Sequence, residues 1–165
     1  MNTSYYLEKF QKAAGQLDKR LLEQTQIEVA VVEVLHCIVI KLYKRSWANP
    51  GTDPLTSESR IFFAVWVSDP SIKEQKILYN IHAFKLRQLI GYAIESRKFA
   101  NEFRAKFKPF EIQWPNVSVQ YGPLTLMEGW LKIEPENMEG EILRLCNQFI
   151  RIASLVDEAL LKFKR

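Results

Sequence analysis

The segment RIFFAVWVS, residues 60–68, restricts the possible folds more than any other part of the chain. Its alternating side chains form two apolar sets, which are Ile61, Phe63, Val65 and Val67 on one face and Phe62, Ala64 and Trp66 on the other. Strands with apolar side chains on both faces are typical of central strands in sheets that are covered on both sides. The segment therefore predicts a central strand that is covered on both faces.

Neighbouring strands are predicted on either side of this segment. Residues 75–85 alternate apolar and polar side chains after a turn at Asp69-Pro70-Ser71, which predicts a hairpin with the central strand. Residues 26–45 are rich in Val and Ile, which favour strands. Because one straight strand of this length would be unusual, we predict a bend or bulge near His36 and Cys37. A buried helix is the alternative, since an apolar face at helical spacing also runs through these residues.

Three helices are predicted from apolar residues at helical spacing. The first covers residues 4–23. The second starts near Ser96, a predicted cap, and ends at about Lys108, before Pro109; its apolar ridge is formed by Phe99, Phe103 and Phe107. The third follows Pro135 and carries the longest stripe, which consists of Ile142, Leu145, Phe149, Ile152, Val156, Ala159 and Phe163.

The remaining segments complete the predicted order of elements. Residues 47–58 contain two breaker pairs with proline and predict a loop. Residues 116–121 predict a short strand, and Glu128-Gly129 predicts a turn between two further apolar stretches. The order is then α-β-β-β-α-β(-β)-α. Strands and helices segregated in this way predict an α+β fold, in which helices pack on a mostly antiparallel sheet, as a single domain over residues 1–165.

Composition narrows the class of protein. The chain is 47% hydrophobic and 25% charged, which is typical of a globular domain. Cys37 and Cys146 lie far apart without other metal-binding residues nearby, so neither a disulfide framework nor a zinc site is predicted. The first residues lack the pattern of a signal peptide, and charged residues interrupt the apolar stretch 27–43. We therefore expect a soluble cytoplasmic protein.

Positive charge is concentrated between residues 85 and 108. Seven of the 23 basic residues lie there, and Glu95 and Glu102 are the only acidic residues among them, although the whole chain carries only +4. Clustered positive charge attracts polyanions. This basic segment is therefore a candidate anion-binding or nucleic-acid-binding face, formed by Lys85, Arg87, Arg97, Lys98, Arg104, Lys106 and Lys108. The alternative is an ordinary solvated face around the phenylalanine ridge.

A second candidate surface lies between Trp114 and Pro123. Two prolines, a glycine and two aromatic residues bracket the short strand predicted there. Aromatic rings on a rigid edge are common in recognition surfaces, so Trp114 and Tyr121 are candidate contact residues. A buried strand with fixed ends is the alternative interpretation.

No residue pattern predicts a catalytic centre. His36 and His82, the only histidines, have no partner at the spacing of a catalytic triad. The order α-β-β-β-α-β is similar to that of restriction-endonuclease-like folds, a resemblance that implies carboxylates holding a divalent metal and an acid-x-Lys pair. Only Glu74-Gln75-Lys76, with Asp69 across the turn, comes near that pattern. The resemblance is therefore one of element order alone, which does not establish function.

These features together predict a small binding protein and no catalytic activity. The first hypothesis is contact with a protein partner or self-association. The second is nucleic-acid binding through the basic segment, and the third is a metal-dependent nuclease. No membrane association, metal or other cofactor is expected.

Overall fold

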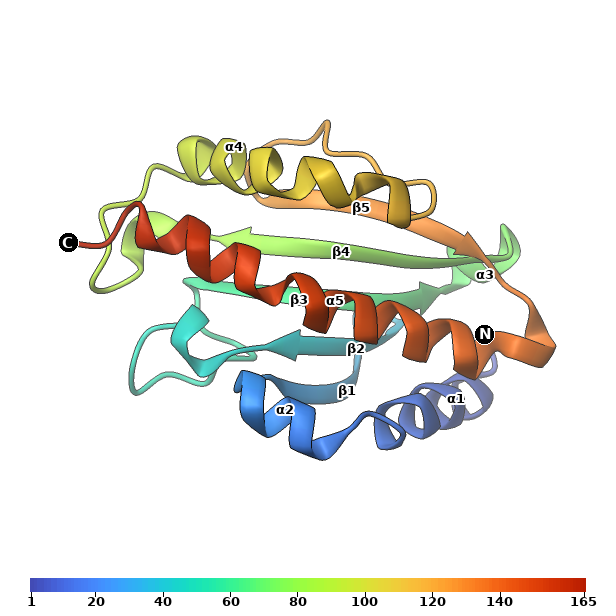
Figure 1. The fold of residues 1–165 in the computed structure, drawn as a ribbon. Coiled ribbons are helices and arrows are strands. Elements are labelled where there is room, and N and C mark those ends of the chain that lie inside the picture. Colours follow the sequence, from blue (N-terminus) through green and yellow to red (C-terminus); the bar gives the residue numbers. More distant parts are fainter.

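The computed structural model describes residues 1–165 and contains one sheet of five antiparallel strands (Figure 1). Each strand pairs with its neighbour in the sequence, in the order β1-β2-β3-β4-β5. The predicted α+β class is confirmed. The strands are β1 (Glu28–Val34), β2 (Cys37–Tyr43), β3 (Arg60–Ser68), β4 (Lys76–Phe84) and β5 (Thr125–Lys132). The helices are α1 (Thr3–Gly15), α2 (Lys19–Thr25), α3 (Asp69–Lys73), α4 (Ser96–Phe107) and α5 (Met138–Leu161), with short 3-10 turns at Arg45–Trp47, Leu86–Gln88, Lys108–Gln113 and Pro135–Asn137.

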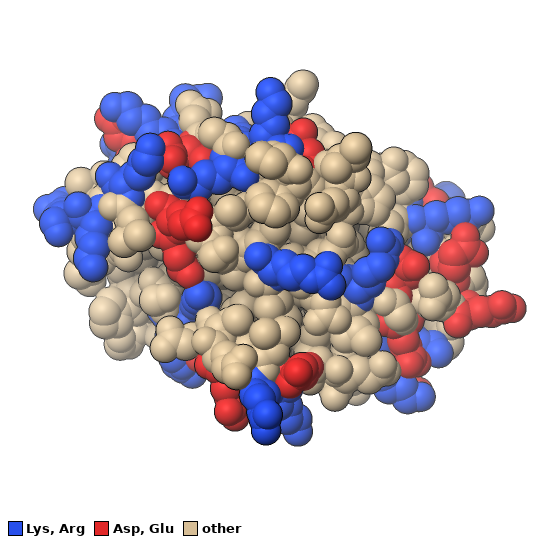
Figure 2. Space-filling view, in the orientation of Figure 1, with Lys and Arg blue, Asp and Glu red and all other residues tan.

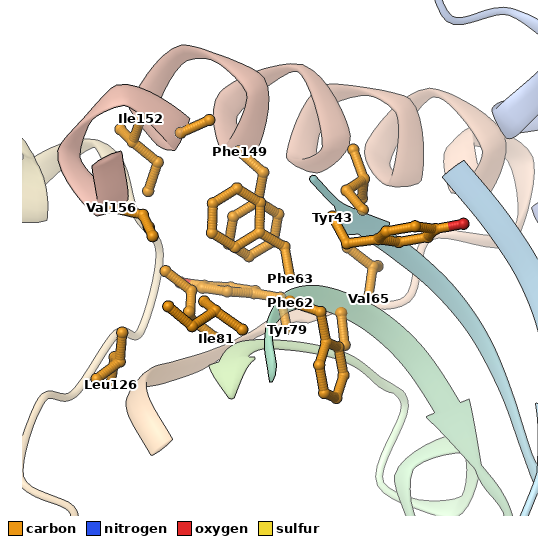
Figure 3. Packing of buried hydrophobic residues seen from close by; sticks show 14 of the residues in the cluster. Tyr43, Phe62, Phe63, Val65, Tyr79, Ile81, Leu126, Phe149, Ile152 and Val156 are labelled. Atoms are coloured by element: carbon orange, nitrogen blue, oxygen red, sulfur yellow. The ribbon is translucent and has the colours of Figure 1, made fainter. Parts of the chain in front are cut away.

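The longer helices all lie on one side of the sheet (Figure 1). α5 crosses this side over β3, while α4 packs near β5 and α1 packs against β1 and β2. Most of the core lies between this helix layer and the sheet, where Phe149 of α5 stacks on Phe63 of β3 with ring centres 4.6 Å apart (Figure 3). Burying such a side chain stabilises the fold by about 1.5–3 kcal/mol, so the apolar stripe of α5 holds the helix on the sheet.

Several predicted elements are confirmed at nearly the expected boundaries. β3 spans the predicted residues, β4 forms the predicted hairpin with it, and α5 follows Pro135. α4 is also confirmed, and Phe99, Phe103 and Phe107 are fully buried. The helix begins at Ser96 itself, after Glu95, and no side chain caps it, so the cap predicted at Ser96 is wrong.

Residues 26–45 form a hairpin of two strands, β1 and β2. The chain reverses at Leu35 and His36, whose φ angles are 50° and 62°. Positive φ at both central residues is the pattern of a type I′ turn, for which Asn-Gly is the usual sequence. The predicted single bent strand is therefore wrong, because the chain reverses and forms two paired strands. The break nevertheless occurs at the predicted place, near His36 and Cys37.

The first predicted helix is divided in two. α1 ends at Gly15, and α2 starts after Asp18, whose side chain accepts hydrogen bonds from the backbone N–H groups of Arg20 and Leu21. Leu17, one of the apolar residues expected on a single stripe, lies in the short connection between the two helices, and its side chain is buried. An aspartate that accepts from the first free N–H groups in this way is a typical N-cap, and it stabilises the start of a second helix at this position.

Two predictions near the C-terminal strand are wrong. Residues 116–121 form no strand and contribute only an isolated bridge between Ser118 and Glu128. No turn occurs at Glu128-Gly129, since β5 runs continuously through both residues. A glycine within a strand often marks a close approach by another group, and here Tyr79 occupies that space.

The expected covering of β3 on both faces is also wrong. Phe63 points toward α5, whereas Phe62 points away from α5 (Figure 3). The side of the sheet toward which Phe62 points carries none of the longer helices (Figure 1). This second side is here called the open face (Figure 1). No helix of this chain is both long enough and apolar enough to cross a membrane.

Candidate functional site

A hollow of about 260 Å³ lies on the open face, near the middle of the sheet. Strand alternation places its lining residues, because every second side chain points away from the helix layer. We call it the open-face hollow. Its lining comes from β2, β3, β4 and the β1–β2 turn and consists of Val34, Leu35, Cys37, Val39, Lys41, Arg60, Phe62, Ala64, Trp66, His82 and Phe84.

The apolar part of the hollow is aromatic. Phe62 and Ala64 are almost inaccessible to solvent, whereas Trp66 and Phe84 are partly exposed. Phe62 and Phe84 meet edge to face, with ring centres 5.6 Å apart. Leu35 at the tip of the β1–β2 turn is 88% exposed and stands at the margin of the hollow. Exposed apolar side chains beside an aromatic hollow are typical of a binding surface.

Two basic side chains, Lys41 and Arg60, line the same hollow. Lys41 Nζ lies 4.8 Å from the centre of the Phe62 ring, and the guanidinium carbon of Arg60 lies 5.2 Å from it. Arg60 also lies over Phe84, and one of its terminal nitrogens donates to the Ser57 carbonyl. Burial lowers the pKa of both side chains, and the charge of Arg60 lowers the pKa of Lys41 further. Partly desolvated cations over aromatic faces gain about 1–2 kcal/mol from the rings.

His82 stands beside these cations, in contact with the Phe62 ring at 5.1 Å between centres. Asn80 Nδ2 lies 3.0 Å from His82 Nε2 and donates to Glu128 Oε1 at 3.1 Å. Burial lowers the pKa of His82, and the charges of Lys41 and Arg60 act in the same direction. The Leu124 carbonyl opposes them, without reaching hydrogen-bond geometry. A neutral ring that accepts from Asn80 fits these surroundings.

Cys37 is the one potential nucleophile in the hollow. Its Sγ lies 3.6 Å from the Leu35 carbonyl oxygen, to which the thiol donates. Burial raises the pKa of this thiol, and the charge of Asp69 raises it further. Because the thiolate is the reactive form, the raised pKa makes Cys37 less reactive than an ordinary exposed cysteine.

Three lysines of the basic segment are paired with acidic residues of the chain. Lys85, Lys98 and Lys106 form ion pairs with Glu58, Glu95 and Glu102 at 3.5, 2.9 and 3.6 Å. Figure 2 views the helix side and shows Lys and Arg gathered at the end of the molecule that holds the C-terminus, with Asp and Glu close by.

Arg104 has a structural role on α4. Its guanidinium donates to the backbone carbonyls of four residues, which are Tyr121, Gly122, Thr125 and Leu126. It is therefore not directed at solvent, contrary to its expected place on a charged outer face. Arg87, Arg97 and Lys108 are exposed and lack a carboxylate within 4 Å; Arg87 and Lys98 also line a separate polar hollow with Glu95 and Arg165.

The candidate recognition edge is divided between core and surface. Trp114 is only 3% exposed and packs against Phe149 and Tyr79 in the core, with ring centres 4.8 and 5.4 Å away. Its expected role as a surface contact is therefore wrong, because its ring fills the core. Tyr121 is 40% exposed in the loop that Arg104 holds.

The acids considered for a metal do not converge. Asp69 Oδ1 pairs with the N-terminal ammonium at 2.9 Å. Glu74 Oε2 lies 3.7 Å from Nζ of Lys76, two residues further along the chain. No group of three or more His, Cys, Asp or Glu side chains is arranged to hold a metal ion.

Sequence reasoning missed the open-face hollow, although one signal was present. β3 is apolar on both faces, but the predicted helices suffice to cover only one side of a five-stranded sheet. The residues that meet in the hollow lie far apart in sequence, and only strand register brings Lys41 beside Ala64 and His82 beside Phe62.

Comparisons with known proteins add no relative. No protein-family model matches the chain, and neither a curated protein nor a solved structure was found to be similar to it. Function is therefore inferred from the geometry and charge of the open-face hollow.

Proposed function

We propose that the protein is a non-catalytic binding protein that holds the flat apolar part of a small organic molecule in the open-face hollow. One observation carries this proposal. Phe62, Ala64 and Trp66 line a hollow on the side of the sheet away from the helix layer, and no segment of the chain fills it. Aromatic side chains with a few polar groups around a concavity are the usual composition of small-molecule sites.

The size of the hollow favours a small molecule over a protein as the occupant. Its volume of about 260 Å³ is close to the lower end of the ~300–1,000 Å³ that such sites commonly have. A stable protein interface buries roughly 800 Å² on each partner and engages about 20–30 residues. The 11 lining residues of the hollow form a much smaller and more concave surface.

The reactive groups of the hollow support binding more than reaction. Cys37 donates to the Leu35 carbonyl, and burial raises the pKa of its thiol. His82 Nε2 lies within hydrogen-bond distance of Asn80 Nδ2, and burial lowers the pKa of His82. Neither group is paired with the other as a nucleophile and its base, which covalent catalysis requires.

The direct test is titration with N-phenyl-1-naphthylamine, a neutral aromatic probe whose fluorescence rises in apolar surroundings. We expect saturable binding of one probe per chain. Ala64→Leu adds bulk at the floor of the hollow. It should weaken probe binding by about tenfold or more, because the leucine side chain fills space that the probe would otherwise occupy. Ala105→Leu is the matched control, since Ala105 is exposed on α4, on the helix side of the sheet.

The contrary result is clear for the same titration. Equal probe binding by wild type and Ala64→Leu, or no saturable binding at all, would remove the hollow as the binding site. Circular dichroism of Ala64→Leu establishes that the variant is folded.

Thiol reactivity supplies an independent measurement. Cys146 is fully buried and Cys37 lines the hollow, so one thiol reports on its occupancy. Saturating N-phenyl-1-naphthylamine should slow the reaction of Cys37 with a thiol reagent. An unchanged rate at saturation would place the probe elsewhere on the protein.

A protein partner, self-association and nucleic-acid binding through the basic segment stay predictions. The ion pairs of Lys85, Lys98 and Lys106 reduce the charge that the segment offers to a polyanion.

A further inference from the structure

The open-face hollow contains positive charge without a counter-charge. Neither Lys41 nor Arg60 has a carboxylate within 4 Å, although 11 ion pairs occur elsewhere in the chain. Lys41 Nζ makes no hydrogen bond within the chain, and Arg60 reaches only the Ser57 carbonyl. Partly buried charges are usually paired, because desolvation of an unpaired charge is unfavourable.

Buried polar atoms without hydrogen-bond partners gather at the same place. The chain has five such side-chain atoms, and three of them, Arg60 Nε, Asn80 Oδ1 and His82 Nδ1, belong to residues on the open face. Asn80 is 2% exposed and is the direct partner of Ala64 in the β3–β4 ladder. A buried polar atom that lacks a partner costs about 1–3 kcal/mol, whether it is a donor such as Arg60 Nε or an acceptor such as Asn80 Oδ1, so this group of atoms indicates a place where another molecule can supply partners.

Phe62 is the common neighbour of the three basic residues of the hollow. Lys41, Arg60 and His82 lie 4.8, 5.2 and 5.1 Å from its ring centre, measured to the nitrogen, the guanidinium carbon and the imidazole centre. They come from three adjacent strands, β2, β3 and β4. An anionic group placed among them would meet the positive charges of Lys41 and Arg60 and several N–H donors within one small region.

We propose that the ligand is a planar organic anion whose carboxylate is bound by Lys41 and Arg60, an inference that rests on the proposed function. Its apolar body lies along Ala64 and Trp66, which continue the hollow on β3 beyond Phe62, with Lys41 as the ladder partner of Ala64. The guanidinium of Arg60 offers the planar pair of donors that suits a carboxylate, and Lys41 adds a point charge. Two acids act near this group: Glu128 accepts from Asn80, and the charge of Asp69 acts on Cys37.

The test compares two competitors of nearly identical shape, 2-naphthoate and 2-naphthamide, which differ in charge. Each displaces N-phenyl-1-naphthylamine from the folded protein, and the two dissociation constants are compared. A charge-assisted hydrogen bond strengthens binding more than a neutral one, so we expect naphthoate to bind about tenfold more tightly than naphthamide.

Variants then locate the charge that recognises the carboxylate. Lys41→Met keeps an unbranched side chain of similar length without its charge, and it breaks no hydrogen bond within the chain. It should reduce the preference for naphthoate to about twofold or less, while naphthamide binding changes by less than about twofold, because only the charged contact is lost. Arg60→Met should act in the same way, and Arg60→Lys, which keeps the charge but not the planar donors, should retain part of the preference.

Lys108→Met and Arg97→Met are the matched controls, since both residues are exposed cations outside the hollow. Both should keep the full preference for naphthoate. The inference is overturned if wild type binds the two competitors equally, if the preference survives Lys41→Met, or if Lys108→Met abolishes it.

The two proposals fail in different ways. Suppose that naphthamide and N-phenyl-1-naphthylamine bind, that Ala64→Leu weakens the binding of both, and that naphthoate has no advantage. The proposed binding site is then retained, and the proposed recognition of a carboxylate is wrong. If no probe binds, both proposals are wrong.

Discussion

Tyr79 of β4 lies across Gly129 of β5 so closely that a Cβ atom on Gly129 would be 2.2 Å from Tyr79 Oη. The two residues are direct partners in the β4–β5 ladder. The hydroxyl continues past the glycine and donates to the Pro115 carbonyl at 2.5 Å. Gly129 is therefore the gap through which Tyr79 ties the loop after α4 to the sheet, and it is not the turn that its sequence suggests.

Gly129→Ala should destabilise the fold by about 1–3 kcal/mol, because the added methyl group overlaps the Tyr79 ring and displaces its hydroxyl from Pro115. Denaturant unfolding measures the change. Gly122→Ala is the control, since a Cβ there meets no atom within 4 Å. Equal stability of the two variants would show that Tyr79 moves aside without loss.

Asp157 of α5 holds the loop after β2. It accepts from Trp47 Nε1 at 2.8 Å and from Lys44 Nζ at 2.6 Å. Asp157→Ala should lower the free energy of unfolding by about 1–3 kcal/mol, because it leaves the buried indole N–H without an acceptor. Asp157→Asn keeps an acceptor oxygen and should cost less. Glu158→Ala, at the adjacent exposed position, should change stability by no more than about 0.5 kcal/mol.

Arg104 and Arg97 lie on the same helix but have different roles. Arg104→Met removes four hydrogen bonds to backbone carbonyls and should destabilise the protein by about 1.5–3 kcal/mol. Arg97→Met should stay within about 0.5 kcal/mol of wild type, since Arg97 is exposed and lacks an ion-pair partner. Thermal or denaturant melts of the two variants measure the difference. Similar melts would contradict the structural role of Arg104.

Stability should fall as the pH is lowered below 6.5, in part because of His82. Its folded pKa lies below the ordinary value of 6.5, mainly through burial, so the unfolded chain takes up the proton first. Over that interval the unfolded state binds more protons, which makes unfolding more favourable as pH falls. His82→Gln should lessen this loss of stability, whereas His36→Gln, in the exposed β1–β2 turn, should not. Denaturant midpoints measured from pH 7.5 to 5 test the difference.

The candidate site could be predicted only in part. The basic segment was visible because its charges are adjacent in sequence, but the fold brings Glu58 to Lys85 and four backbone carbonyls to Arg104. Trp114 was singled out by its neighbouring prolines, and the same rigid tract carries it into the core against Phe149. Neither outcome depends on local composition, so neither could be read from the segment itself.

The sequence by itself determined the class of fold, the limits of β3, β4 and α4, and the buried faces of α4 and α5. These follow from periodicity, which is a local property of each segment. Only the tertiary structure decided that the chain reverses at Leu35-His36 and that β5 continues through Gly129. It also decided that the helices gather on one side of the sheet and leave Lys41, Arg60 and His82 together on the other. Strand register and the choice of covered face depend on contacts between residues far apart in sequence, which no single segment encodes.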